Sequence, residues 1–188
     1  MTSICDQLTE HLRSIWQTSE ITSVRWTLGP IERSLPGFVV LRVAPTVEGQ
    51  PWVYVSAGAS RIPCFGDERF EFFITAVRDS PAHIETLAMA CHFHADERYR
   101  LHLGKIVDIG RPWDDGSQLH HLLVSLPYPY GPRLEHCKVG GSPVRLFWLL
   151  PISATEADYA IANGVESLER EFDRLGIDYL DNQRPSVV

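Results

Sequence analysis

The sequence predicts an α+β fold in which a central, mainly antiparallel or mixed sheet is flanked by helices. Its segments run in the order helix, strands, helix, strands, helices, without the regular strand-helix alternation of a doubly wound nucleotide-binding fold. Its 188 residues, 44% hydrophobic and 22% charged, suit a globular chain that buries a sizeable core. We therefore predict that residues 1–188 form a single domain.

The first element is an amphipathic helix. Apolar residues between Ile4 and Trp16 recur at helical spacing, and polar residues occupy the other side. Strand-like segments follow, rich in aromatic and β-branched residues and bounded by glycine or proline. They are SVRWTLGP, GFVVLRVAP, PWVYVSAGAS and FEFFITAV.

A change of hydrophobic period at Ser80-Pro81 predicts a helix that extends to about Arg98. Serine is a good N-cap, and proline suits the first helical position. On this helix we expect His92 and His94 near the surface. The expected buried stripe is Ile84, Leu87, Ala88, Cys91 and Ala95.

The second half contains LHLGKIVDIG, HLLVSLPY and VRLFWLLPI as predicted strands. The last of these is apolar at both parities except at Arg145, which predicts a central strand covered on both faces. The capping-box spacing of Ser153 and Glu156 predicts that a helix begins there. Gly164 should break it, and a second helix should end at Gly176.

Charge and hydropathy exclude several classes of protein. The net charge of −7 argues against a nucleic-acid partner and leaves room for a basic protein partner. No apolar run approaches the roughly 20 residues that span a bilayer, and the N-terminus lacks the pattern of a secretory signal. We expect a cytoplasmic protein that does not insert into a membrane.

The cysteines and histidines do not form a metal-binding pattern. No HExxH, CxxC or zinc-knuckle spacing occurs, so we predict neither a metal nor another cofactor. In the cytosol, the cysteines should be reduced thiols that pack as small apolar residues. They are Cys5, Cys64, Cys91 and Cys137.

The loop RPWDDGSQLHH holds the residue types of a hydrolase. Ser117, His120 and either Asp114 or Asp115 would supply a serine, histidine and aspartate triad. Ser117 is not set in the GxSxG elbow that usually exposes such a nucleophile. We therefore predict a turn whose side chains bond to local backbone. A small hydrolase or metalloenzyme that uses Ser117, His120 and His121 stays as the alternative.

Two further features resemble functional motifs but have structural interpretations. Gly58 in SAGAS lacks the rest of a phosphate-binding loop, so we predict a bulge or turn at a strand end. Glu68 and Glu71 alternate in facing along the next strand. We predict one solvent-exposed charge and one ion-paired carboxylate, with no role as an acid-base pair.

Several segments together resemble the suppressor of fused family. They are PWVYVSAGAS followed by RFEFFI, then PWDDGSQLHHLLVSLPY, VRLFWLLPI and YLDNQRPSV. The resemblance, to single-domain bacterial members and to the N-terminal domain of the animal protein, covers about Trp52 to Val188. The matching residues, which we interpret as fold markers, are Tyr54, Ser56, Gly58, Glu71, Pro112, Gly116, Ser117, His120, Pro127, Pro151, Glu156, Arg184 and Pro185.

This resemblance implies an α+β fold, no enzymatic activity and a protein partner. The animal protein sequesters zinc-finger transcription factors between two lobes, and we expect this shorter chain to lack the second lobe. Bacterial relatives are regarded as immunity proteins that neutralise polymorphic toxins. We therefore expect a non-catalytic, cytosolic protein-binding domain with an immunity role. A sequestering regulator of a transcription factor is a further alternative.

Two surfaces are candidates for partner binding. SVRWTLGP, closed by Gly29-Pro30, is a candidate edge strand to which an extended segment could add. The loop PYPYGP offers two tyrosines as anchors, unless they pack over the end of the core. The candidate contact residues are Tyr128, Tyr130, Trp26, Trp113 and His120.

Overall fold

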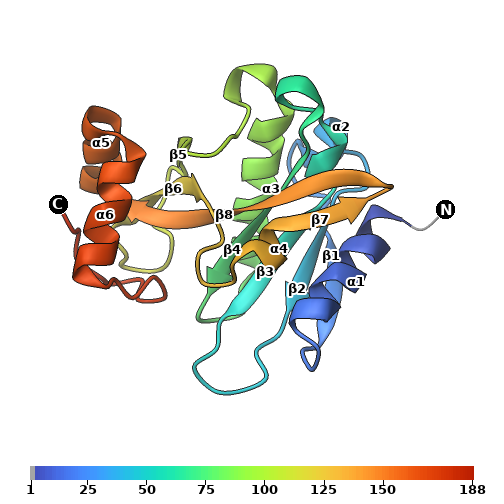
Figure 1. The fold of residues 1–188 in the computed structure, drawn as a ribbon, viewed down its shortest axis with the longest axis horizontal. Coiled ribbons are helices and arrows are strands. Elements are labelled where there is room, and N and C mark those ends of the chain that lie inside the picture. The colour runs from blue at the N-terminus through green and yellow to red at the C-terminus, as the bar shows by residue number, and fades with distance from the viewer. Residues whose placement is uncertain (1–2) are drawn as a thin grey trace. The chain divides into compact units, whose positions relative to one another are not determined.

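The computed structural model describes residues 3–188, which form two compact units (Figure 1). Unit 1 contains the residues up to Leu101 together with Leu126–Trp148, and unit 2 contains His102–Ser125 and Leu149–Val188. Strand β8 (Ser142–Ser153) contributes its first part to unit 1 and its last part to unit 2. The assignment of residues 1–188 to a single domain stays a prediction.

Unit 1 is built on a mixed sheet, which confirms the predicted α+β class. Strands β1 to β4 follow one another as antiparallel neighbours, β4 pairs with β8 in parallel, and β7 pairs with β8 antiparallel. Every residue of β4 is buried, so both faces of that strand are covered. The strand bounds are β1 Ile21–Arg25, β2 Val39–Val43, β3 Trp52–Ala57, β4 Phe70–Ala76 and β7 His136–Val139.

Two long helices pack on this sheet. Helix α1 (Ile4–Ile15) begins with a capping box between Ser3 and Asp6, and it contacts β2, β3 and β7. Helix α3 (Pro81–Ala95) begins at the predicted N-cap Ser80, and it contacts β2, β3 and β4. The sequence analysis did not predict β7 or the one-turn helices α2 (Ile31–Ser34) and α4 (Pro132–Glu135).

Two local predictions in unit 1 are wrong. Helix α3 ends at Ala95, because the chain turns at Asp96 into a 3-10 segment, Glu97–Tyr99. His94 is fully buried, not near the surface. Its ring packs edge-on to Phe72 with centroids 4.9 Å apart, so the aromatic side chains of β4 take it into the core.

Unit 2 combines strands with the C-terminal helices. Strand β6 (Leu119–Ser125) lies between β8 and β5 (Ile106–Asp108). Helix α5 (Ala154–Asn163) starts at the predicted capping box of Ser153 and Glu156. Helix α6 (Val165–Leu175) follows Gly164 and ends at Gly176 in the left-handed conformation, as predicted. Within residues 3–188, no helix is long and apolar enough to cross a membrane.

Candidate partner-binding surface

The loop with hydrolase-like residues is a structural turn in unit 2. The Ser117 amide donates to the Asp114 carbonyl at 3.0 Å, and the Asp115 amide donates to Asp114 Oδ1 at 2.9 Å. Gly116 supplies the positive φ of 73° that the turn requires. These contacts confirm the predicted turn with local side-chain bonding.

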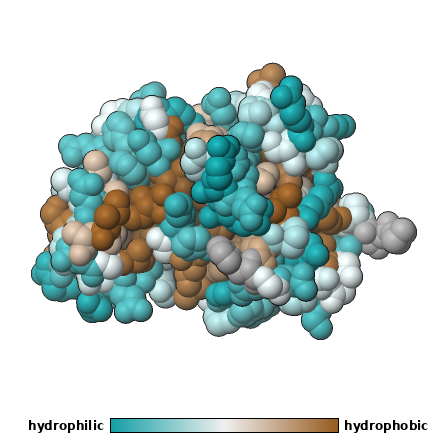
Figure 2. All heavy atoms as spheres, turned by 90° about the horizontal axis from the view of Figure 1, so that it is seen from above, coloured by the Kyte–Doolittle hydropathy of each residue, from teal (hydrophilic) through white to brown (hydrophobic). Residues whose placement is uncertain are grey.

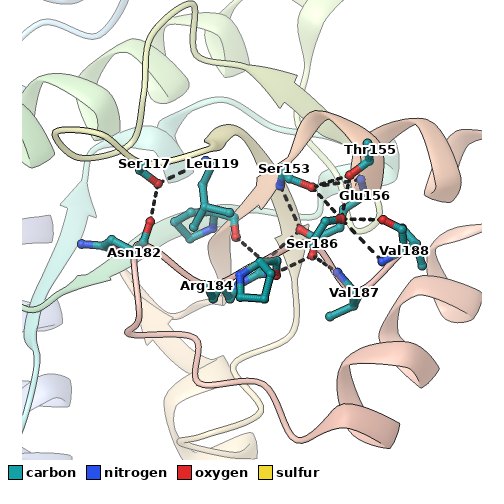
Figure 3. Close-up of polar contacts among 12 residues, drawn as sticks. Ser117, Leu119, Ser153, Thr155, Glu156, Asn182, Arg184, Ser186, Val187 and Val188 are labelled. Carbon is teal, nitrogen blue, oxygen red and sulfur yellow. Dashed lines mark hydrogen bonds and ion pairs between the residues drawn. The ribbon is translucent and has the colours of Figure 1, made fainter.

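The Ser117 hydroxyl is committed to the backbone. It donates to the Asn182 carbonyl at 2.5 Å and accepts from the Leu119 amide at 3.1 Å, and Ser117 is 4% exposed (Figure 3). A nucleophilic serine instead donates its proton to a general base and stands open to substrate. The arrangement gives no support to the hydrolase alternative.

The same turn holds the C-terminal tail. Asn182 Nδ2 donates to Asp114 Oδ2 at 3.0 Å, and Gln183 Nε2 donates to the Asp115 carbonyl at 3.1 Å. Trp113, proposed as a partner contact, is only 2% exposed, so that assignment is wrong. Its amide donates to the Leu119 carbonyl at 2.7 Å, which holds the residue inside unit 2.

A buried ion pair joins the tail to helix α5 (Figure 3). Glu156 is fully buried and Arg184 is 5% exposed, and two hydrogen bonds of 2.5 and 2.9 Å connect them. The Ser153 and Val187 amides also donate to the carboxylate, at 2.8 and 3.1 Å. Arg184 Nη2 reaches the Pro151 carbonyl at 3.3 Å. Three fold markers, Pro151, Glu156 and Arg184, therefore meet in one network.

Unit 1 contains a second buried carboxylate, and its predicted ion pair is wrong. Glu71 is fully buried and accepts from the hydroxyls of Ser56 and Ser60. Three successive amides, those of Gly58, Ala59 and Ser60, donate to it at 2.9, 3.2 and 3.0 Å. Burial raises the pKa of the Glu71 carboxyl, and these hydrogen bonds oppose that rise. The small residues of SAGAS were the signal that sequence reasoning missed.

Gly58 forms the predicted turn at the end of β3. Its φ is 142°, a backbone conformation that residues other than glycine rarely adopt, whereas an added Cβ would make only an ordinary van der Waals contact with Phe38, at 3.6 Å. This backbone turn aims the following amides at Glu71. Tyr54, another fold marker on β3, donates its hydroxyl to Asp79 at 2.7 Å.

A cysteine and a histidine also meet in unit 1, without the geometry of a catalytic pair. His94 Nδ1 accepts from the Leu101 amide at 3.3 Å, so Nε2 carries the proton and faces Cys64 Sγ at 3.4 Å. A ring in this tautomer is unable to take the thiol proton through Nε2. Burial lowers the pKa of His94 to about 4, and the charge of Arg100 acts in the same direction.

The described residues 3–188 contain no group of three or more histidine, cysteine or acidic side chains that could hold a metal ion. The four cysteines are free thiols, and three of them are buried, as expected for small apolar residues. Burial raises the pKa of the Cys137 thiol to about 12, so at neutral pH it is not a thiolate ligand or nucleophile.

Strand β1 forms an edge of the sheet in unit 1. It pairs with β2, and the Ala44 amide donates to the Glu20 carbonyl at 2.9 Å just beyond the strand. Hydrogen-bonded and non-hydrogen-bonded residue pairs alternate along an antiparallel ladder, so this bond shows which residues of β1 bond to β2. The amides and carbonyls of Ile21, Ser23 and Arg25 therefore point away from β2. Trp26, a candidate contact, follows β1 and is partly exposed.

The two tyrosines of PYPYGP have different environments. Tyr128 is 61% exposed, whereas Tyr130 packs edge-on against Trp16 and Phe73 with ring centroids 5.2 and 5.9 Å away. Tyr130 and Trp16 also line a small cavity of about 80 Å³. Its other lining residues, at the ends of β2 and β3, include Val43, Pro45, Pro51 and Val53. Edge strand β1 begins at Ile21, five residues after Trp16, and Ile21 pairs with Val43 of β2.

Exposed apolar side chains occur in several places. On the face drawn in Figure 2, hydrophobic patches lie among polar residues. Scattered exposure of this kind is normal for a protein surface, so it does not by itself identify a binding site. His120, the remaining candidate contact, lies on β6 of unit 2 and is partly exposed.

The architecture defines a class of α+β protein in which a mixed sheet carries loops held by buried polar networks. The chain belongs to the suppressor of fused family, because the family model described as suppressor of fused protein matches residues 35–185. This finding confirms the resemblance seen in the sequence. It also places the chain in a regulatory, non-catalytic family.

Solved structures agree with this assignment. The chain is 44% identical to a suppressor of fused homologue from Neisseria gonorrhoeae, with a TM-score of 0.86 over 97% of this chain and 95% of the other. Drosophila suppressor of fused shares the fold at 15% identity, with a TM-score of 0.72 over 97% of this chain and 51% of the other.

A chain from the Sufu–Fu complex also shares the fold, at 14% identity and a TM-score of 0.69, over 96% of this chain and 90% of that one. This chain spans about half the length of the Drosophila protein. No protein with a curated function matches the chain.

Proposed function

We propose that this chain is a non-catalytic protein-binding domain that captures an extended partner segment along strand β1. The outward amides and carbonyls of Ile21, Ser23 and Arg25 carry this proposal, because such groups pair readily with an added strand. The family supports a protein partner, since a structure of similar fold is that of a complex between Sufu and Fu.

The cavity beside Trp16 and Tyr130 supplies selectivity to the same surface. Its volume of about 80 Å³ is smaller than the 150 Å³ or so that accommodates benzene, so it suits a small aliphatic side chain. Main-chain pairing would provide affinity, and this side chain would fix the register of the bound segment.

The proposed partner is a toxin domain, and the proposed role is that of a cytoplasmic immunity protein. The support is the family resemblance together with the net charge of −7, which accelerates association with a basic partner. A toxin domain encoded beside this gene is the protein to test. Binding measured by calorimetry, together with rescue of cells that express the toxin, would establish the role.

A proline at position 23 tests the binding mode. Ser23 faces Leu41 across a pair without ladder hydrogen bonds, so Ser23→Pro removes an outward amide and leaves the β1–β2 ladder intact. We expect the affinity for the toxin domain to fall at least tenfold. Ser23→Ala is the matched control, because it keeps the amide and should bind as the wild type does.

The tyrosines provide a second measure on the same complex. Tyr130→Ala should weaken binding by about 1 kcal/mol or more, because it opens the cavity wall. Tyr128→Ala should have a similar effect if the exposed ring is an anchor. Unchanged affinity in Ser23→Pro, with the fold retained by circular dichroism, would reject the β1 surface.

A further inference from the structure

A second hollow lies in unit 1 at the opposite end of helix α1 from Trp16. It has a volume of about 290 Å³. Its lining includes Ile4 of α1, Ser60 and Arg61 beside β3, Arg69 before β4, and the β7–β8 turn at Gly140. We propose that this groove binds an acidic side chain of a protein partner between Arg61 and Arg69. The inference depends on the proposed function only in taking a protein as the ligand.

The charge of the groove carries the inference. Among the described residues, its lining contains two arginines and no acidic side chain. Arg69 Nη1 donates to the Ser60 carbonyl at 2.9 Å, and Arg61 Nη1 donates to the Pro36 carbonyl. A guanidinium has five N–H donors, so each retains capacity for a carboxylate.

Other arginines in this acidic chain show the contrast. Arg42, Arg145 and Arg184 are each paired with a carboxylate, Asp79, Glu135 and Glu156 respectively. Among the described residues, the recorded partners of Arg61 and Arg69 are main-chain carbonyls. Two guanidiniums that share one groove without a carboxylate are a ready site for an anionic group.

The groove is preorganised by hydrogen bonds to the buried carboxylate of Glu71. Ser60, whose carbonyl holds Arg69, is itself fixed by two bonds to buried Glu71, from its amide at 3.0 Å and its hydroxyl at 2.7 Å. The acceptor positions of that carboxylate are filled by hydroxyls and amides, so it is not available to pair with the arginines. Little ordering of the site is therefore needed on binding.

The remaining walls of the groove are apolar, so they suit an apolar residue next to the acidic one in the bound partner. Ile4, Val139 and Val144 line the groove. Gln7 Oε1 accepts from the Gly140 amide at 2.7 Å and so fastens α1 to the turn. The volume suits about two side chains, and the mixed lining selects an acidic residue beside an apolar one.

Amide and guanidinium NMR spectra of the full ¹⁵N-labelled chain test the site. The probe is the acetylated, amidated hexapeptide (Leu-Glu)₃, and (Leu-Gln)₃ is its uncharged match. We expect (Leu-Glu)₃ to shift Gly140, Gly141 and the Nε–Hε signals of Arg61 and Arg69. The Gln peptide should bind at least fivefold more weakly, and added salt should weaken the Glu peptide.

Variants decide whether the arginines are responsible. Arg61→Gln with Arg69→Gln should weaken the binding of (Leu-Glu)₃ at least tenfold. Arg13→Gln, which removes an exposed arginine in the last turn of α1, should leave it unchanged. Equal binding of the two peptides, an unaffected double variant, or shifts confined to Ile21–Arg25 would each overturn the groove proposal. The last result would leave capture at β1 standing, and binding by the Ser23→Pro variant tests that function separately.

Discussion

Glu71 in unit 1 and Glu156 in unit 2 are both fully buried carboxylates, but the chain stabilises them differently. Glu71 accepts from two hydroxyls and three consecutive amides, and all of these donors belong to the short segment Ser56–Ser60. Glu156 is paired with the guanidinium of Arg184, 28 residues away. The neutral donors around Glu71 fix the shape of one short loop, whereas the charge of Arg184, distant in sequence, fixes the path of the C-terminal tail against helix α5.

The largest effect should come from removing the counter-charge. Arg184→Ala leaves Glu156 buried without a cation, which we expect to reduce the free energy of unfolding by about 3–5 kcal/mol. Urea denaturation would measure this loss. Arg174→Ala, which breaks an exposed pair with Glu171, should cost less than about 1 kcal/mol. Similar losses in the two variants would remove the distinction drawn between buried and exposed arginines.

The buried ring of His94 in unit 1 should make the free energy of unfolding depend on pH. The pKa of His94 is about 4 in the folded chain and 6.5 as its ordinary value, so the unfolded chain binds the proton more tightly. Stability from this group is complete above pH 6.5 and is lost as the pH falls towards 4. The loss should reach roughly 3 kcal/mol.

Urea denaturation across pH 4–7 would measure the slope, with His94→Gln as the variant that does not titrate. The slope should be shallower in His94→Gln than in the wild type. Identical slopes would show that the folded ring does not have a lowered pKa.

A smaller effect is expected from Glu71→Gln. The hydroxyls of Ser56 and Ser60 can rotate to suit a carboxamide, and the Gln oxygen can still accept from the amides of Gly58 and Ser60. The Ala59 amide, however, then faces an NH2 group in place of Oε2. We expect a loss of about 1–3 kcal/mol in the free energy of unfolding. Glu68→Gln, at an exposed position, is the matched control. A loss larger than that of Arg184→Ala would contradict the ranking of the two networks.

Much of the fold could be predicted because its signals are local. The N-cap at Ser80, the capping box at Ser153 and the apolar run of β8 each depend on neighbouring residues, and each is confirmed. The burial of His94 was not predictable from helical spacing, since Phe72 and the Leu101 amide, which receive it, come from other segments. Strand β7 was missed because four residues give too short a pattern.

The candidate surface was only partly predictable. Gly29-Pro30 correctly indicated an edge strand, although β1 ends at Arg25, before Trp26. Trp113 was a poor choice, because an aromatic residue suits either an interface or a core and sequence alone does not separate the two. The groove between Arg61 and Arg69 depends on how α1, β4 and the β7–β8 turn meet, and no sequence motif marks it.

The parallel pairing of β4 with β8 has a consequence for synthesis of the chain. Phe70 pairs with Arg145 in the register. The edge of β4 that faces β8 therefore has no partner until that part of the chain has emerged from the ribosome. At about 5–20 residues per second, the interval between Ala76 and Arg145 is roughly 3–14 s. During that time FEFFITA can pair with β3, but its other edge stays unpaired, and a mostly apolar strand in that state is the kind of segment that chaperones shield from aggregation.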